Sequence, residues 1–196
     1  MPGTSNDATD EELMLAFSRG STDAFAELFS RYKQPLFGFF RRRVPDPSHA
    51  EELTQETFLA ILRASSRYEA SALFRTYLYA IAFKILRAHR RKAAFRAVFH
   101  ADAATHEPAS RNTFDTSLVL RDAVRRLDPH DREVLLLREF EQLSYAEIAD
   151  LLRLPLNTVR SRLFRARTAL HTLLSAPAPT PSLAQSPSFA ESQERI

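Results

Sequence analysis

The sequence predicts an all-α fold, with two small helical domains joined by a flexible linker and a helix-turn-helix in the second domain. Along most of the chain, apolar residues recur at the three- and four-residue spacing of amphipathic helices. Only three of the 196 residues are glycine, and the alternating apolar and polar runs of strands are few. A hydrophobic content of 44% and a charged content of 26% fit a globular protein.

The composition also limits where the protein acts. The chain has no cysteine, which excludes disulfides and thiolate metal sites and suits the reducing cytoplasm. Its first residues show no basic start followed by an apolar run, so no signal peptide is expected. No apolar run approaches the roughly 20 residues that a membrane span needs. We therefore expect a cytoplasmic protein that does not insert into a membrane.

A first domain of four helices is expected over residues 9–92, after a flexible arm at residues 1–8. Thr9 and Glu12 have the pattern of a capping box, in which each side chain satisfies the backbone N–H of the other residue. Gly20 ends the first helix, and Pro35 is a candidate kink or break in the second. The predicted helices span residues 9–19, 21–40, 48–64 and 71–92.

The helix predicted over residues 48–64 is apolar on two faces. One face carries Leu53, Ala60 and Ile61, and the other carries Phe58, Leu59 and Leu62. Such a helix is either central in a bundle or half buried and half committed to a partner, and the pattern leaves both interpretations open. The acidic residues in its first turns also favour the positive end of the helix dipole.

The helix predicted over residues 71–92 combines apolar, aromatic and basic residues. Its expected buried stripe comprises Leu73, Phe74, Tyr77, Leu78, Ile81 and Ile85. Its expected outward face comprises Arg75, Tyr79, Phe83 and Arg90. Aromatic rings stack on unpaired bases and arginines follow phosphates, so this face is typical of single-strand binding. Rings at this spacing also pack against neighbouring helices, which is the alternative.

The rest of the chain divides into a linker, a second domain and a tail. Residues 93–116 lack sustained periodicity and predict a flexible linker. A second helical domain is expected over residues 117–174, where Asp128 and Pro129 have the pattern of an N-cap and a first helical position. Residues 175–196 are rich in proline, serine and alanine, and we expect them to be disordered.

Residues 144–167 have the pattern of a helix-turn-helix, whose second helix enters the DNA major groove. Ser144 and Glu147 form a second capping box, Pro155 interrupts the apolar pattern, and Asn157 is a candidate cap of the next helix. That helix has an apolar stripe of Val159, Leu163, Ala166 and Leu170. Its other side carries Asn157, Thr158, Ser161, Phe164, Arg165 and Thr168, with Arg160 and Arg162 at the edges.

This outward face fits DNA because arginine binds guanine edges or phosphates and an apolar ring meets a thymine methyl. A helical hairpin with an ordinary basic surface is the alternative. The charge distribution favours DNA: residues 84–96 carry six cations and residues 153–167 carry five, with no acid in either segment. Two such segments in a chain of net charge +3 predict two nucleic-acid footprints.

The order of these segments resembles an extracytoplasmic-function sigma factor of the sigma-70 family, over residues 9–92 and 117–174. The similarity to the family's core-polymerase-binding helix lies in AEELTQETFLAILR, residues 50–63. The similarity to the segment that recognises and melts the −10 promoter element lies in FRTYLYAIAFKILRAHRRK, residues 74–92. The similarity to the −35 reader lies in LSYAEIADLLRLPLNTVRSRLFRAR, residues 143–167.

The resemblance implies a protein that binds core RNA polymerase and directs promoter recognition and transcription initiation. The residues implied to bind core polymerase are Glu52, Gln55, Glu56 and Phe58. Those implied to bind and melt the single-stranded −10 element are Arg75, Tyr77, Tyr79, Phe83 and Arg90. Those implied to bind the −35 duplex are Asn157, Thr158, Arg160, Ser161, Arg162, Phe164 and Arg165. No cofactor or metal is expected, and an anti-sigma factor, which restrains many members, is a candidate partner.

The chain departs from the family pattern at three places. Tyr77 stands where the family usually has Trp, and Phe83 and Lys84 stand where it usually has Arg and Asn. Arg153 stands in the turn of the helix-turn-helix, where the family commonly has Gly. A non-glycine residue with positive φ there would cost on the order of 1 kcal/mol.

Two other function classes are alternatives to a sigma factor. A helix-turn-helix repressor or activator would use the same C-terminal domain, with residues 9–92 for sensing or dimerisation. An enzyme is not expected, because the sequence contains no HExxH, GxxxxGK[ST] or GxSxG motif and no cysteine nucleophile. The six histidines form no ligand cluster along the sequence.

Overall fold

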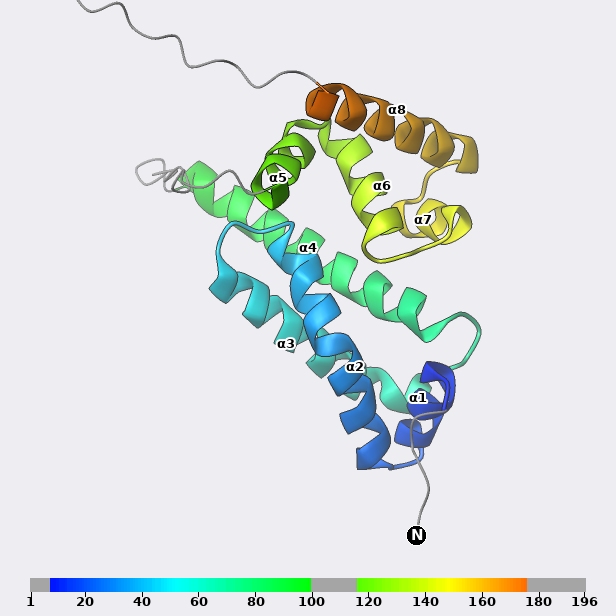
Figure 1. Ribbon diagram of the computed structural model, residues 1–196. Helices are drawn as coiled ribbons and strands as arrows, with labels where there is room; N and C mark the ends of the chain where they lie inside the picture. Colours follow the sequence, from blue (N-terminus) through cyan, green and yellow to red (C-terminus); the bar gives the residue numbers. More distant parts are fainter. Residues whose placement is uncertain (1–7, 100–115, 176–196) are drawn as a thin grey trace, which may run out of the picture.

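The protein is all-α in the part that its structure describes. The computed structural model describes residues 8–99 and 116–175, which form eight α-helices and one short 3-10 turn, Ser65–Arg67, without a strand. The helices are α1 Asp10–Ser18, α2 Thr22–Arg41, α3 Pro47–Ala64, α4 Phe74–Phe99, α5 Thr116–Arg126, α6 Pro129–Glu139, α7 Tyr145–Leu152 and α8 Leu156–Ser175. Figure 1 shows α1–α4, the N-terminal unit, beside α5–α8, the C-terminal unit. None of these helices is both long and apolar enough to cross a membrane.

The core of the N-terminal unit lies between α2, α3 and α4, with α1 across one end (Figure 1). Its largest fully buried side chains are Met14, Leu28, Leu36, Phe39, Phe40, Ile61, Phe74, Leu78 and Leu86. Each such side chain contributes about 1.5–3 kcal/mol when it leaves water. This packing holds α3 and α4 side by side, and these are the two helices with predicted binding roles.

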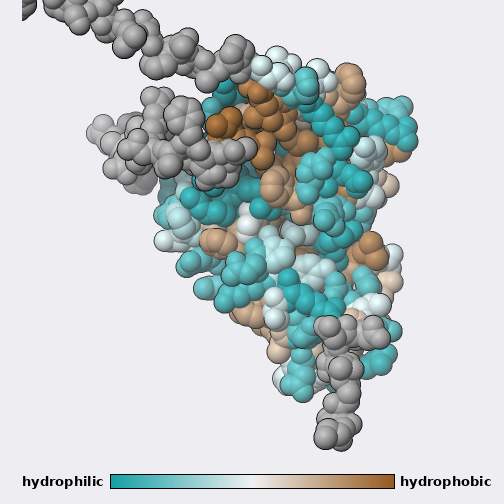
Figure 2. Space-filling model, in the orientation of Figure 1, coloured by the Kyte–Doolittle hydropathy of each residue, from teal (hydrophilic) through white to brown (hydrophobic). Residues whose placement is uncertain are grey.

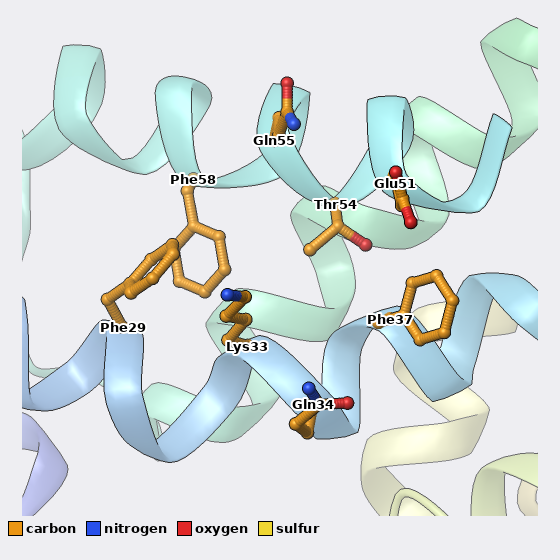
Figure 3. Close-up of a pocket in the computed structure, with 8 residues that line it drawn as sticks. All are labelled: Phe29, Lys33, Gln34, Phe37, Glu51, Thr54, Gln55 and Phe58. Carbon is orange, nitrogen blue, oxygen red and sulfur yellow. The ribbon is translucent and has the colours of Figure 1, made fainter. Parts of the chain in front are cut away.

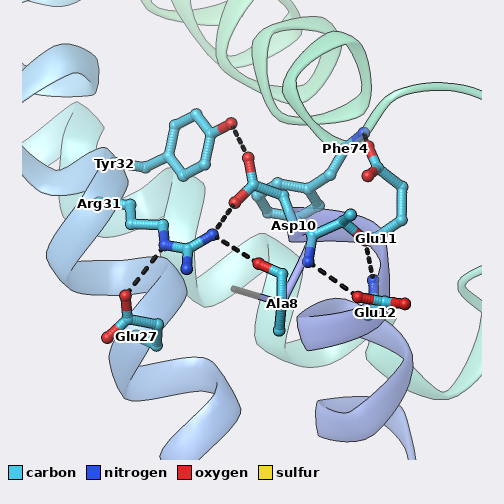
Figure 4. Close-up of polar contacts among 9 residues, drawn as sticks. Ala8, Asp10, Glu11, Glu12, Glu27, Arg31, Tyr32 and Phe74 are labelled. Carbon is cyan, nitrogen blue, oxygen red and sulfur yellow. Dashed lines mark hydrogen bonds and ion pairs between the residues drawn. The ribbon is translucent and has the colours of Figure 1, made fainter. Parts of the chain in front are cut away.

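Polar contacts fasten α1 to α2 and to the start of α4 (Figure 4). The Arg31 guanidinium of α2 lies 2.8 Å from the Asp10 carboxylate, and the Tyr32 hydroxyl donates to the same carboxylate. The Glu11 carboxylate accepts a hydrogen bond of 2.6 Å from the backbone N–H of Phe74. Because Phe74 is the first residue of α4, this bond helps to set where α4 begins.

The C-terminal unit is built around α8, which packs against α6 and is flanked by α5 and α7. Its buried side chains include Leu127, Val134, Leu137, Leu143, Ile148, Val159, Leu163 and Ala166. The predicted cap of α6 is confirmed, since the Asp128 side chain accepts from two backbone N–H groups and Pro129 follows it. Both predicted capping boxes, at α1 and α7, are confirmed as well.

Several predicted boundaries differ from the structure. Helix α4 begins at Phe74 instead of residue 71 and continues to Phe99, so residues 93–99 of the predicted linker are helical. Helix α2 runs through Pro35 as one element. The expected cap at Asn157 is wrong: α8 begins at Leu156, and the Asn157 side chain accepts from Arg160 at 3.3 Å. The predicted arm up to residue 7, the linker at 100–115 and the tail from 176 lie outside the described residues.

The turn between α7 and α8 contains a left-handed residue. Arg153 ends α7 with φ 54° and ψ 52°, and its backbone N–H returns to the carbonyls of Ala149 and Asp150. The condition under which a non-glycine residue is costly here, a positive φ, is therefore met. An L-residue in this conformation brings Cβ close to the following carbonyl oxygen, at a cost of roughly 1–2 kcal/mol.

We expect Arg153→Gly to stabilise the protein. The relief of about 1–2 kcal/mol exceeds the additional chain entropy that glycine loses on folding, about 0.4–1 kcal/mol. The net gain, on the order of 0.5–1 kcal/mol, is measured as a shift of the urea midpoint followed by circular dichroism. Arg153→Ala is the control, because it removes the same side chain and keeps the Cβ. An equal gain in both variants would contradict backbone strain as the cause.

Candidate functional site

The second helix of the helix-turn-helix, α8, presents its predicted outward face to solvent. Val159, Leu163 and Ala166 are buried against the rest of the C-terminal unit, as the apolar stripe predicts. On the other side, the exposed predicted residues are Asn157, Arg160, Ser161, Phe164 and Arg165, while Thr158 and Arg162 are half-buried. Phe164 is 71% exposed. An aromatic ring this open, beside several arginines, has the chemistry of a base-contacting face.

Arg165 is held by a partner that the sequence did not indicate. Its Nε and one Nη each donate a 2.9 Å hydrogen bond to the two carboxylate oxygens of Asp131 on α6. Asp131 is a buried acidic residue 34 positions earlier in the chain. The forked pair fixes the guanidinium against α6 and occupies the edge that would bind guanine in a bidentate manner.

The predicted −10 residues on α4 are less accessible than expected. Arg75 and Tyr77 are half-buried and Arg90 is exposed, but Tyr79 is only 3% exposed and Phe83 only 8%. Tyr79 and Phe83 therefore do not project into solvent, and the alternative, in which these rings pack against neighbouring side chains, is confirmed. Leu73, placed in the predicted buried stripe, lies before the helix and is 52% exposed.

The burial of Tyr79 arises because α4 is covered on two sides. The centre of the Tyr79 ring lies 5.5 Å from the centre of the Phe39 ring on α2. Burial raises the pKa of Tyr79 to about 12, and the nearby Glu141 carboxylate of the C-terminal unit adds to the shift. An amphipathic pattern along one helix does not show that a second unit packs on its outer face.

Charged side chains make the contact between the two units. Arg43, which is 1% exposed, lies 2.8 Å from the Glu133 carboxylate and 3.1 Å from that of Glu141. Arg42 also binds Glu141, at 2.9 Å, and stacks its guanidinium 4.3 Å from the centre of the Phe140 ring. The sequence carries no signal for this contact, because it joins residues ninety or more positions apart.

A second contact between the units lies at the start of α7. There the Thr76 hydroxyl of α4 donates to Glu147, the residue that also closes the capping box with Ser144. Partial burial acts to raise the pKa of Glu147. Hydrogen bonds from Ser144 and Thr76 favour the ionised carboxylate and hold this pKa below its usual value. The first turn of the helix-turn-helix is thus bound to the helix that carries the predicted −10 residues.

Helix α3 forms a groove with α2 (Figure 3). The groove has a volume of about 500 Å³, and the rings of Phe29 and Phe58 meet in it with centres 4.7 Å apart. Lys33 of α2 and Glu51 of α3 reach toward it from opposite walls (Figure 3). The groove therefore combines an apolar floor with charged and amide groups at its edges.

The two-faced pattern of α3 is resolved in favour of a half-buried helix. Phe58 joins Leu53 and Ile61 in the buried set, so its placement on a second face is wrong. Leu59 and Leu62 remain exposed. Of the predicted polymerase-binding residues, Glu52, Gln55 and Glu56 are exposed on α3, and Phe58 is the buried anchor beneath them. Within residues 8–99 and 116–175, no three His, Cys, Asp or Glu side chains are placed to hold a metal ion.

Comparisons with known proteins place these surfaces in a family. Residues 28–96 match the family model of Sigma-70 region 2, and residues 117–170 match that of Sigma-70 region 4. The RNA polymerase sigma-H factor of Pseudomonas aeruginosa is 32% identical over 180 residues, which cover 84% of this chain and 93% of that protein. The RNA polymerase sigma factor CarQ of Myxococcus xanthus is 35% identical over 170 residues, covering 82% and 95%.

A solved structure shows the same fold. CnrH, determined in complex with the cytosolic domain of CnrY, superposes with a TM-score of 0.64 at 24% identity. The superposition covers 86% of this chain and 99% of CnrH. The arrangement of helices in α1–α8 is therefore one that a solved protein also adopts.

Proposed function

The chain belongs to the sigma-70 family, as an RNA polymerase sigma factor of the extracytoplasmic-function type. From this premise we propose which of its surfaces contact polymerase and promoter. The observation that carries the proposal is the order of three surfaces along one chain. They are the groove between α2 and α3, the outer face of α4 and the exposed face of α8. The proposed role is that of a binding subunit in the cytoplasm, with no catalytic chemistry of its own.

We propose that α3 and its groove bind core polymerase. Glu52, Gln55 and Glu56 offer exposed polar groups, and the rings of Phe29 and Phe58 offer apolar surface in the groove. Interfaces gain most of their free energy from a few apolar anchors surrounded by polar groups, and this groove has that composition. The exposed Leu59 and Leu62 extend the apolar surface along α3.

We propose that α4 captures unpaired bases of the −10 element. Arg75 and Tyr77 are accessible in part, and Arg90 is exposed further along the helix. Tyr79 is buried against Phe39 of α2 and feels the charge of Glu141 of the C-terminal unit, so it reaches a base only when the packing around it opens. The packed arrangement is thus a state in which −10 recognition is incomplete, and binding to polymerase would have to open it.

We propose that α8 reads the −35 duplex, chiefly through Phe164, Arg160 and Ser161, which are exposed. Arg165 supports them by fixing α8 to α6 through Asp131, and it keeps one Nη free of the carboxylate to meet a phosphate. Thr158, Arg162 and Asn157 stand near the start of the same face. The anti-sigma partner implied by the family resemblance remains a prediction for this chain.

A single substitution tests the polymerase surface. We expect Glu56→Ala to weaken binding to purified core polymerase by about fivefold, or roughly 1 kcal/mol, which is the loss typical of a contributing interface residue. Glu56 is exposed and has no ion pair in the described part of the chain, so folding should not change. The dissociation constant is measured by fluorescence anisotropy with labelled protein, and promoter sequence preference should stay as it is.

Glu69→Ala is the matched control, since Glu69 is also exposed but lies outside α3. An equal loss in both variants would show that only overall charge matters. Failure of the native protein to bind core polymerase would overturn the whole proposal and revive the alternative of a repressor or activator. That alternative has no support in the comparisons, because the sigma-factor relatives match across both helical units.

A further inference from the structure

A second cavity lies between the two helical units. It has a volume of about 450 Å³ and is lined by the end of α2 on one side and by α5 and α6 on the other. Small-molecule sites in proteins commonly occupy 300–1,000 Å³ and occur where two domains meet. The cavity shares one lining residue, Phe37, with the groove between α2 and α3, and no residue of α8 lines it.

The charged groups that line this cavity are all cationic. They are Arg41, Arg42, Arg121, Arg125 and Arg132. No acidic residue lines it, and Glu141, which pairs with the lining residue Arg42, is also bound by Arg43. So many guanidinium groups around one space repel one another, and a bound anion would remove that repulsion.

Two of the arginines that line the cavity lie on α5, and their side chains have no acidic partner in the described residues. Arg121 and Arg125 stand four residues apart on one helix, a spacing at which like charges destabilise the helix. Neither makes an ion pair or a side-chain hydrogen bond within the described residues. Asp122, on the same helix, lies outside the cavity lining and is also unpaired there. The arginine forks are therefore available to a ligand.

The remaining lining is apolar. Val124 and Leu136 lie on the side of the C-terminal unit, with Phe140 at the end of α6 and Phe37 on the opposite side. Figure 2 shows hydrophobic side chains gathered over α5 and α6, with hydrophilic ones around them. A space with guanidinium groups on its walls and rings beside them suits a ligand that is anionic at one end and aromatic at the other.

We propose that this cavity binds a phosphorylated small molecule of the nucleotide class. The phosphates would bind the arginines in the bidentate manner that guanidinium groups favour, and the base would lie against Phe140 and Val124. Arg41 belongs to the N-terminal unit and Arg121 and Arg125 belong to the C-terminal unit. A bound ligand therefore bridges the units and favours their packed arrangement over their separation.

Isothermal titration of the full-length protein with ATP, inorganic tripolyphosphate and adenosine tests the site. ATP is expected to bind most tightly, tripolyphosphate more weakly, and adenosine not measurably. Arg121→Gln combined with Arg125→Gln should weaken ATP binding at least tenfold, and Arg41→Gln on the opposite wall should weaken it as well. ATP should also raise the thermal midpoint of the native protein and not that of the double variant.

The matched control is Arg63→Gln combined with Arg67→Gln, which removes the same charge from two exposed arginines away from the cavity. It should bind ATP as the native protein does. Equal weakening in the control and the α5 variant would reduce the effect to general attraction between a basic protein and an anion. No ATP binding by the native protein at about 1 mM, or unchanged binding by the α5 variant, would overturn the proposal. Because the test contains no polymerase or promoter, its outcome is independent of the promoter-recognition role.

Discussion

Replacing Arg43 with alanine is expected to destabilise the packing of the two helical units by about 3–5 kcal/mol, the usual loss when one partner of a buried ion pair is removed. Arg43 is almost fully buried and joins Glu133 and Glu141 across the contact. Without it, Glu133 loses its only ion pair in the described part of the chain, and buried Glu141 keeps only Arg42. Separation of the units returns both carboxylates to water, so we expect the units to part while each keeps its own core.

The measurement is energy transfer between dyes on the two units. The chain has no cysteine, so cysteines introduced at the exposed Ser66 and Ser175 give unique labelling sites. Transfer efficiency should fall in Arg43→Ala and fall less in Arg43→Lys, which keeps the charge but cannot fork between two carboxylates. Arg67→Ala serves as the control for surface charge. Unchanged transfer in Arg43→Ala would show that the buried charges do not hold the units together.

Phe164→Ala is expected to lower initiation at promoters that depend on a −35 element by roughly tenfold, which lies within the 1–3 kcal/mol that a good base contact contributes. The ring is open to solvent and makes no aromatic or cation–π contact in the described part of the chain, so its loss should leave folding intact. Run-off transcription by polymerase reconstituted with each variant gives the rate. Phe164 is a cleaner test than Arg165, because Arg165→Ala would also break the pair with Asp131.

Two controls separate recognition from stability. His171→Ala changes an exposed residue later on the same helix and should initiate as the native protein does. On a template whose −35 sequence is scrambled, the difference between Phe164→Ala and the native protein should disappear. A loss of initiation that persists on the scrambled template would show that Phe164 acts through something other than the −35 duplex.

Much of the fold could be predicted because local signals agree along the chain. Capping residues at Thr9, Asp128 and Ser144 start the helices at which they were placed. The end of α4 differs from the prediction for a local reason. Residues 93–99 have no apolar period, which predicts a linker, but they include several alanines, which favour a helix.

The binding surfaces were less predictable because they depend on contacts between distant segments. The exposure of Phe164 follows from the period of one helix, and it was predicted. The burial of Tyr79 depends on the packing of α4 on α2, where its ring meets that of Phe39. The pairing of Arg165 with Asp131 depends on the packing of α8 on α6. A single sequence does not indicate which arginine pairs with which acidic residue, because many combinations are possible.

The length of α4 also governs how far the two units can move apart on their tether. Sixteen residues, 100–115, separate the last residue of α4 from the first residue of α5. A chain of that length spans at most about 55 Å, whereas a helix that ended at Lys92 would have left 23 residues and a reach of about 80 Å. Because residues 93–99 are helical, they lengthen the rigid helix α4 by only about 10 Å, along a fixed direction. For a molecule that binds the −10 element with one unit and the −35 element with the other, as proposed, the end of α4 bounds the promoter spacing that it can bridge.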